Sequence, residues 1–278
     1  MIYNGQNPTS EEVSNLSDFD GVAYITELEE YVTRFAENRS GKIFLTHNYD
    51  APKSDALEAI ALSRSIDGTA SSLFDFISLK PAMNAARVIK SPYEIKMIRK
   101  ANEITAEAHV NVLKAIKGLG NEAEIEAIFL GTCIKNQAKR QAYGAIAGSG
   151  ENASTLHYEA NNESLEGRQL VCLDAGCEWE CYASDVTRTF PISGKFSTEA
   201  QAIYDLVEKM QEECIEMVKP GASYRDIHLH AHSVATRGLI DLKILRGDFD
   251  DVLKSGASMA FFPHGLGRES LPAFSIFV

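Results

Sequence analysis

Residues 173–190 read LDAGCEWECYASDVTRTF, and this stretch decides the fold. Its two ends are rich in β-branched and aromatic residues and its centre is polar, which is typical of two antiparallel strands joined by a turn. Asp174 and Asp185 lie eleven residues apart. In an antiparallel hairpin, residues whose numbers share a constant sum face each other. A symmetric turn centred between Trp179 and Glu180 therefore predicts that Asp174 lies directly opposite Asp185.

A carboxylate pair of this kind favours a metal site. Directly opposed Cβ atoms lie about 4.5–5.5 Å apart, and two carboxylates so placed repel each other unless a cation lies between them. Hard oxygen donors favour manganese, magnesium, cobalt or iron, and two ions about 3.5–4 Å apart suit a hydrolytic reaction. Two alternatives stay open: both aspartates are solvent-exposed turn and strand-edge residues, or a bulge at Gly176 shifts the register.

Helical patterns lie on both sides of the hairpin. Ser91 and Glu94 around Pro92 predict a capped helix start, and Asn121 with Glu124 predicts a second one. Two further helices are expected after Ser197 and after Ser223, the latter with Asp226 as its capping partner. Because the strands cluster between the second and third of these helices, the pattern predicts an α+β fold.

Residues 1–86 alternate short helical and strand-like pieces, with KIFLTHNY (42–49) as a buried strand and SDALEAIALSRSI (54–66) as a helix. No coherent site is expected in this part of the chain.

Composition restricts the partners. The chain has 278 residues and a formal net charge of −12, which argues against nucleic acid or an anionic membrane surface as a partner. No apolar run is long enough to span a bilayer, and the first residues do not read as a signal peptide. Five cysteines without a regular framework are typical of reduced thiols. A cytoplasmic protein is expected.

Two lesser motifs receive structural interpretations. HLHAH (228–232) places His228 and His232 one helical turn apart, but without a third partner they are expected to be surface and boundary histidines of an amphipathic helix. CEWEC lacks the second cysteine pair of a zinc ribbon, so Cys177 and Cys181 are expected to be strand and turn residues.

The hairpin, extended to DAGCEWECYASDVTRTFPISGKF (174–196), resembles the first metal-ligand hairpin of the M24 metallopeptidases, the creatinase or pita-bread family. Four further stretches resemble the family in the same order: RVIKSPYEIKMIRKANEI (87–104), GSGENASTLHY (148–158), LIDLKILRGDFDD (239–251) and FFPHGLG (261–267). The resemblance is to the Xaa-Pro aminopeptidase and prolidase branch, with the fungal enzymes nearest. It implies part of an α/β N-terminal domain over 1–86, an incomplete pita-bread catalytic domain over 87–267 and a non-family tail over 268–278.

The resemblance also implies roles for particular residues. Asp174 and Asp185 match two of the family's five metal ligands, which hold two manganese ions, with Asp185 as the bridging ligand. His157 matches the histidine that steadies the substrate and the tetrahedral intermediate. His264 matches the first histidine of the family's HGLGH turn, which lies beside the site and is counted here with the catalytic residues.

The chain departs from the family at the ligand histidine, where it has Arg268, and the two later ligand glutamates do not follow. A guanidinium has no lone pair to give a metal. We therefore expect this polypeptide to bind metal weakly and to have negligible peptidase activity. Arg-Glu-Ser at 268–270 is what a histidine codon interrupted by a GTGAGT splice donor would encode, so a retained intron is hypothesised for the tail, and the chain is expected to be truncated at both ends.

Three functions follow from the resemblance. The first is a Xaa-Pro aminopeptidase, which releases an N-terminal residue preceding proline from peptides. The alternatives are a prolidase restricted to Xaa-Pro dipeptides, and a non-catalytic relative that acts by binding or dimerisation. The expected partners are proline-containing peptides, with neither nucleic acid nor membrane, and a homodimer is left open.

Overall fold

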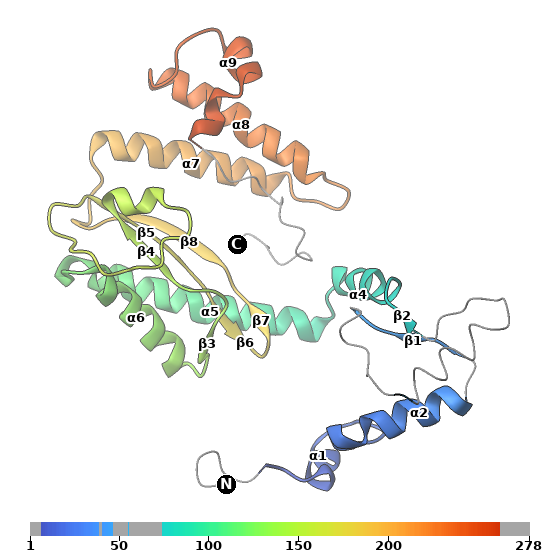
Figure 1. Ribbon diagram of the computed structural model, residues 1–278. Helices are drawn as coiled ribbons and strands as arrows, with labels where there is room; N and C mark the ends of the chain where they lie inside the picture. Colours follow the sequence, from blue (N-terminus) through green and yellow to red (C-terminus); the bar gives the residue numbers. More distant parts are fainter. Residues whose placement is uncertain (1–6, 39–40, 47–54, 56–73, 262–278) are drawn as a thin grey trace. The chain divides into compact units, whose positions relative to one another are not determined.

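The chain forms two compact units, Met1–Ile89 and Lys90–Val278, in the computed structural model (Figure 1). The structure describes residues 7–38, 41–46, 55 and 74–261. No helix within these ranges is long and apolar enough to cross a membrane.

The first unit combines short helices with a small parallel sheet. Its strands β1 (Ile43–Phe44) and β2 (Phe74–Asp75) pair in parallel, and Ala36 is buried among Val32, Ile43 and Phe74. Only the first part of the strand expected over 42–49 is described, and the helix expected over 54–66 lies outside the described residues apart from Asp55. That this unit is part of a family N-terminal domain stays a prediction. Its helices are α1 (Ser10–Leu16), the 3-10 helix Ile25–Glu27, α2 (Leu28–Asn38) and α4 (Leu79–Val88).

Two capped helices begin the second unit, and both starts confirm the sequence prediction. At the start of α5 (Pro92–Ala115), the Ser91 hydroxyl accepts from the Glu94 backbone and the Glu94 carboxylate accepts from the Ser91 backbone. Asn121 and Glu124 form the same box at the start of α6 (Glu122–Lys135). These boxes satisfy backbone N–H groups that the first helical turn leaves without partners. A 3-10 turn, Ile116–Gly118, separates the two helices.

Three more helices follow the strands: α7 (Thr198–Glu216), α8 (Tyr224–Asp241) and α9 (Phe249–Ser255), with the 3-10 helix Ala257–Ala260 after them. The helix expected after Ser197 is α7, and the Ser197 hydroxyl caps it by accepting from the Ala200 backbone. The predicted side-chain cap of α8 is wrong, because the Ser223 side chain makes no capping hydrogen bond. The Ser223 carbonyl instead accepts from the backbone of Asp226 and Ile227, so this turn closes through the main chain.

Two three-stranded antiparallel sheets lie between α6 and α7. One has the order β4 (Ile146–Ser149), β5 (Leu170–Ala175), β8 (Val186–Pro191), and the other has the order β3 (Arg140–Gln141), β6 (Cys177–Trp179), β7 (Tyr182–Ala183). The strands cluster between helices, which confirms the predicted α+β class. Figure 1 shows α5 and α6 along one side of these strands.

The core of the second unit lies between α5, α6 and β5. On β5 the buried side chains are those of Val171, Leu173 and Ala175, which join a cluster containing Ile104 and Phe129 from the helices. Because side chains alternate along a strand, Asp174 points to the opposite face of the sheet. The hydrophobic pattern thereby directs this carboxylate away from the helices.

Candidate metal centre

A tight two-residue turn joins β6 to β7. Trp179 pairs with Tyr182, and the residues between them, Glu180 and Cys181, have φ values of 48° and 68°. This is the left-handed backbone that the central residues of a type I′ hairpin turn adopt. The predicted turn centre, between Trp179 and Glu180, is therefore wrong by one residue.

The shifted turn changes how the two aspartates face each other. Asp174 pairs with Thr187, so the predicted direct opposition of Asp174 and Asp185 is wrong. Asp185 precedes Thr187 by two residues, and such residues share a face of the sheet. The two aspartates are therefore diagonal neighbours on one face, as the shared-face part of the prediction required.

Gly176 lies where the chain passes from β5 into β6. A Cβ atom at this position would collide with the backbone carbonyl of Ser184, so only glycine permits this close approach of the strands. The pairs Ala175–Val186 and Glu178–Ala183 have two residues between them on each strand. No residue is inserted, so the bulge that the sequence left open is not present.

Tyr143 brings the two carboxylates together around its hydroxyl. The Tyr143 hydroxyl lies 2.5 Å from Asp174 Oδ1 and 2.9 Å from Asp185 Oδ1. A phenol has a single proton, so it donates to one carboxylate at a time. Two acidic side chains that are distant from Tyr143 in sequence therefore meet within reach of the same donor.

The environment of these groups shifts their ionisation. Burial raises the pKa of Asp174, and the negative charge of Asp185 raises it further, against the lowering effect of hydrogen bonds from Tyr143 and Thr187. Burial and the hydrogen bond to Asp174 raise the pKa of Tyr143, so its hydroxyl keeps its proton. Asp174 is half-buried and Asp185 is exposed, which leaves this carboxylate pair open to an ion from solvent.

His157 lies near this pair but not on a strand. It occupies an exposed turn after the 3-10 helix Gly150–Ser154. A positive charge on its imidazole lowers the pKa of Asp174, which places the ring within electrostatic range of that carboxylate. The structure therefore brings His157, Asp174 and Asp185 into one neighbourhood.

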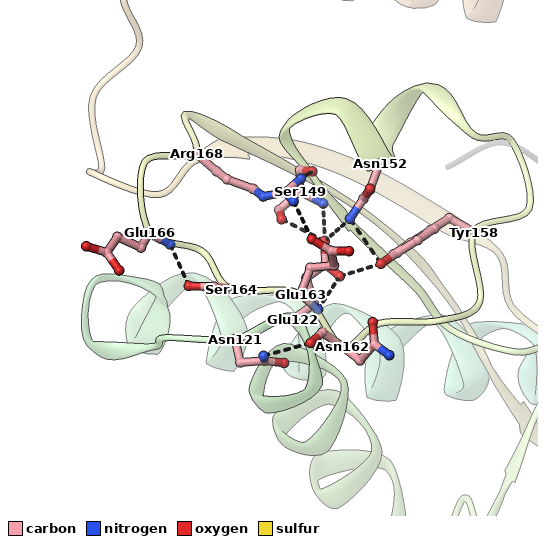
Figure 2. Close-up of polar contacts among 10 residues, drawn as sticks. All are labelled: Asn121, Glu122, Ser149, Asn152, Tyr158, Asn162, Glu163, Ser164, Glu166 and Arg168. Carbon is pink, nitrogen blue, oxygen red and sulfur yellow. Dashed lines mark hydrogen bonds and ion pairs between the residues drawn. The ribbon is translucent and has the colours of Figure 1, made fainter.

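A buried carboxylate anchors the segment that carries His157. Figure 2 shows Glu122, at the start of α6, among polar groups of β4 and the following loop. Burial alone would raise the pKa of Glu122, but the hydrogen bonds that it accepts lower its pKa to about 2. Glu122 Oε1 accepts from the Ser149 backbone N (2.8 Å), Ser149 Oγ (2.6 Å) and Asn152 Nδ2 (3.0 Å), and Oε2 accepts from the Tyr158 hydroxyl (2.7 Å) and the Glu163 backbone N (3.1 Å).

These contacts hold the His157 segment on both sides. Asn152 precedes the histidine and Tyr158 follows it directly, and both bind the same carboxylate. The ionised Glu122 therefore fixes the turn on which His157 lies.

The two aspartates fit a hard divalent cation as part of a ligand set. Carboxylate oxygens are the donors such cations prefer, and two like charges that meet at one hydroxyl are stabilised by a cation. Among the described residues, no group of three or more His, Cys, Asp or Glu side chains could hold a metal ion. His264 and Arg268 lie outside the described residues, so their expected places beside the site stay predictions.

Sequence reasoning missed two residues of this region, Tyr143 and Glu122. Tyr143 is 31 and 42 residues from the aspartates it contacts, and Glu122 is 27 residues from Ser149. Glu122 resembles any acidic residue in the first turn of a helix, where such residues are common. No local pattern in the sequence distinguishes either residue. Cys177 in β6 and Cys181 in the turn confirm the interpretation of the CEWEC motif.

Comparisons with known proteins agree with this geometry. The sequence pattern of metallopeptidase family M24 matches residues 96–269. Two fungal proteins, each named "Probable Xaa-Pro aminopeptidase", are 60% identical (Botryotinia fuckeliana) and 59% identical (Sclerotinia sclerotiorum) over 269 residues, or 96% of this chain. The match covers 48% of each of these proteins, so the chain spans about half the length of the curated relatives it matches.

Solved structures show the same fold. Aminopeptidase P of E. coli, in a zinc-substituted form with product, has a TM-score of 0.84 and 29% identity, over 95% of this chain and 60% of that one. The aminopeptidase PepP of Pseudomonas aeruginosa has a TM-score of 0.82 and 30% identity, over 93% of this chain and 59% of that one. The fold is thus the pita-bread fold of these enzymes. From its sequence pattern, its relatives and its fold, the chain belongs to metallopeptidase family M24.

Proposed function

We propose that this chain carries the first part of the active site of a Xaa-Pro aminopeptidase, an enzyme that releases an N-terminal residue preceding proline. The observation that supports this most is the meeting of Asp174 and Asp185 at the Tyr143 hydroxyl, on the hairpin that resembles the family's metal-ligand hairpin. The names of the fungal relatives support the same substrate class.

The residues of the site have distinct roles in this proposal. Asp174 and Asp185 would hold a divalent cation, which when bound would supply Lewis-acid activation of water and of the scissile carbonyl. Tyr143 and Thr187 donate hydrogen bonds to Asp174 and fix the direction of its oxygens. His157 is exposed beside the carboxylates, where its imidazole reaches a bound peptide and donates a hydrogen bond to the carbonyl oxygen that gains charge during hydrolysis.

Finer attributes of the proposal rest on the family resemblance and on composition. The proposed metal is manganese, two ions per subunit, as the family resemblance implies, and carboxylate ligands are compatible with this ion. The proposed compartment is the cytoplasm, and a homodimer is the proposed assembly. Arg268 stands where the family has a ligand histidine. We therefore expect the 278-residue polypeptide by itself to bind manganese weakly and to hydrolyse Xaa-Pro peptides negligibly.

A chimera tests the function of this chain directly. The chimera is the full-length Botryotinia fuckeliana relative with residues 90–261 of this chain in place of the segment that matches them. The rest of the site then comes from the relative's own sequence. We expect this chimera to hydrolyse Xaa-Pro tripeptides with manganese, and Asp174→Asn within it to lower kcat/KM at least about a hundredfold, since it removes a ligand charge. Asp205→Asn, an exposed aspartate on α7, is the matched control and should keep the activity.

The outcomes separate the candidate functions. Hydrolysis of Xaa-Pro dipeptides alone would support a prolidase. A correctly folded chimera without activity would support a non-catalytic relative that acts by binding or dimerisation. If the isolated 278-residue chain hydrolysed Xaa-Pro peptides as fast as the full-length relative, the expected weak metal binding and negligible activity would be contradicted.

A further inference from the structure

His157 lies in a loop, residues 150–162, whose two ends meet; we call it the histidine loop. It begins after Ser149, the last residue of β4, and ends before Glu163. The Ser149 backbone N–H donates to Glu122 Oε1 (2.8 Å), and the Glu163 backbone N–H donates to Glu122 Oε2 (3.1 Å). The ends of the loop are therefore no further apart than one carboxylate group can span, which is the geometry of an Ω-loop.

Arg168 binds the same two ends through a second group. Its Nη1 donates to the Ser149 backbone carbonyl at 2.6 Å, and its Nη2 donates to the Glu163 carboxylate at 2.7 Å. Figure 2 shows Arg168 and Glu122 together around these ends. A planar guanidinium presents its N–H groups in fixed directions, so it holds two acceptors at a defined separation, which a single ammonium does not do. One anion and one cation thus close the histidine loop at the same place.

The surroundings of Arg168 fit this contact. Gly150, the first residue of the histidine loop, has a φ value of 54°, and a Cβ atom there would lie 3.1 Å from Arg168 Cδ. Glycine therefore permits both the left-handed backbone and the close passage of the arginine. The Arg168 side chain is 22% exposed and Ser149 is fully buried. A hydrogen bond from a charged donor to this shielded carbonyl contributes more than an ion pair on the open surface.

We propose that Arg168 is a positioning residue for hydrolysis, which acts through the histidine loop and holds His157 where its imidazole meets the scissile carbonyl. This inference rests on the proposed aminopeptidase function, in which His157 donates a hydrogen bond to the carbonyl oxygen that gains charge. Such a hydrogen bond strengthens in the transition state, so it contributes to kcat more than to substrate binding. Displacement of His157 should therefore lower kcat and leave KM nearly unchanged.

Arg168 tests this role with less effect on folding than Glu122. The Glu122 carboxylate is fully buried, and its loss leaves several donors without a partner. Arg168 is half-buried, and Arg168→Met keeps the apolar stem of the side chain while it removes both hydrogen bonds. Arg168→Lys keeps the charge without the two-point geometry. Arg225, exposed on α8, loses the same charge in Arg225→Met and is the matched control.

Steady-state hydrolysis of a Xaa-Pro tripeptide by the chimera tests the proposal. We expect Arg168→Met to lower kcat about tenfold with KM within about twofold of the parent chimera, and Arg168→Lys to recover part of this loss. Arg225→Met should keep the parent values, and circular dichroism checks that each variant is folded. Equal kcat values for Arg168→Met and Arg225→Met, or a raised KM with an unchanged kcat, would overturn the proposal.

Amide hydrogen exchange of the 278-residue protein tests the loop independently of activity. The hydrogen-bonded amides that report on it are those of Ser149, Thr155 and Glu163. We expect Arg168→Met to speed their exchange at least about tenfold, because the ends of the loop open more often, and Arg225→Met to leave it unchanged. An inactive parent chimera would contradict the proposed function. Equal exchange in Arg168→Met and wild type would overturn the positioning proposal whether or not the chimera is active.

Discussion

Glu122 is fully buried, with 0% of its surface exposed, yet its carboxylate remains ionised because its two oxygens accept five hydrogen bonds. An isolated carboxylate at this place would be strongly destabilising, and it is tolerated only because every side of it faces a donor. The position of Glu122 explains how an exposed turn can hold His157 in place. The buried Glu122 carboxylate binds residues on both sides of His157 and is shielded from water.

The ionisation of Glu122 predicts a pH dependence of stability. Its folded pKa is about 2, below the ordinary value of 4.5. The ionised Glu122 therefore adds about 3 kcal/mol to the free energy of unfolding. This contribution is fully present above pH 4.5 and is lost as the pH falls toward 2. Urea unfolding between pH 2 and 7, followed by the fluorescence of Trp179, the one tryptophan of the chain, measures it.

The matched variants are Glu122→Gln and Glu151→Gln. Glu151 is an exposed carboxylate in the neighbouring 3-10 helix. We expect Glu122→Gln to be less stable than wild type at pH 7 by about 2–4 kcal/mol and to lose less stability between pH 4.5 and pH 2. Identical pH profiles for wild type and Glu122→Gln would show that the charge of Glu122 does not contribute.

Individual residues of the site were predictable from sequence only where a motif marked them. Asp174, Asp185 and His157 lie in stretches that resemble family motifs, and the structure brings these three together. Tyr143 and Glu122 act through contacts between distant segments, and such contacts depend on the tertiary fold. Their local sequences are compatible with many other environments.

At the scale of secondary structure, the sequence of the β6–β7 turn is a poor match to the backbone conformation that this turn adopts. Glu180 and Cys181 both have positive φ, although side chains with a Cβ atom disfavour this region. Asn-Gly is the pair that this turn type prefers. Because the chain has no Asn-Gly pair here, the sequence did not reveal where the hairpin turns.

Replacing the pair by the preferred residues should stabilise the hairpin. We expect the double variant Glu180→Asn, Cys181→Gly to increase the free energy of unfolding by about 1 kcal/mol, because it relieves left-handed backbone strain. Urea unfolding monitored at Trp179 measures the change. Ala183→Gly, in β7 of the same hairpin, is the control and should destabilise, since glycine weakens a strand. A double variant no more stable than wild type would argue against strain in this turn.

Helix starts marked by nearby capping residues were predicted correctly, whereas the pairing register of strands β5 and β8 was not. The capping boxes at Ser91 and Asn121 need only residues within one helical turn, so the sequence locates the starts of α5 and α6. The pairing of Asp174 with Thr187 depends on the turn and on the close approach at Gly176, which involve other parts of the chain. The α+β class was predictable because it depends only on the order of the elements.

At the scale of the whole molecule, the second unit gives the two faces of its central strand different chemistry. The face of β5 and β8 away from the buried core carries the carboxylates and the Tyr143 contact, whereas Val171, Leu173 and Ala175 on the other face of β5 pack into the core. Oxygen donors select hard divalent ions such as manganese and magnesium. Manganese is therefore a suitable ion to probe the carboxylate pair.

The central claim is that Asp174 and Asp185 form one metal-binding pair, and paramagnetic broadening by Mn²⁺ in the NMR spectrum of the 278-residue protein tests it most directly. The account predicts that at low Mn²⁺ the amide signals of Tyr143 and Thr187 broaden first, that Asp174→Asn or Asp185→Asn abolishes this selectivity, and that Asp205→Asn preserves it. Selective broadening that survives in both site variants, or broadening spread evenly over the acidic surface of the wild type, would contradict the account.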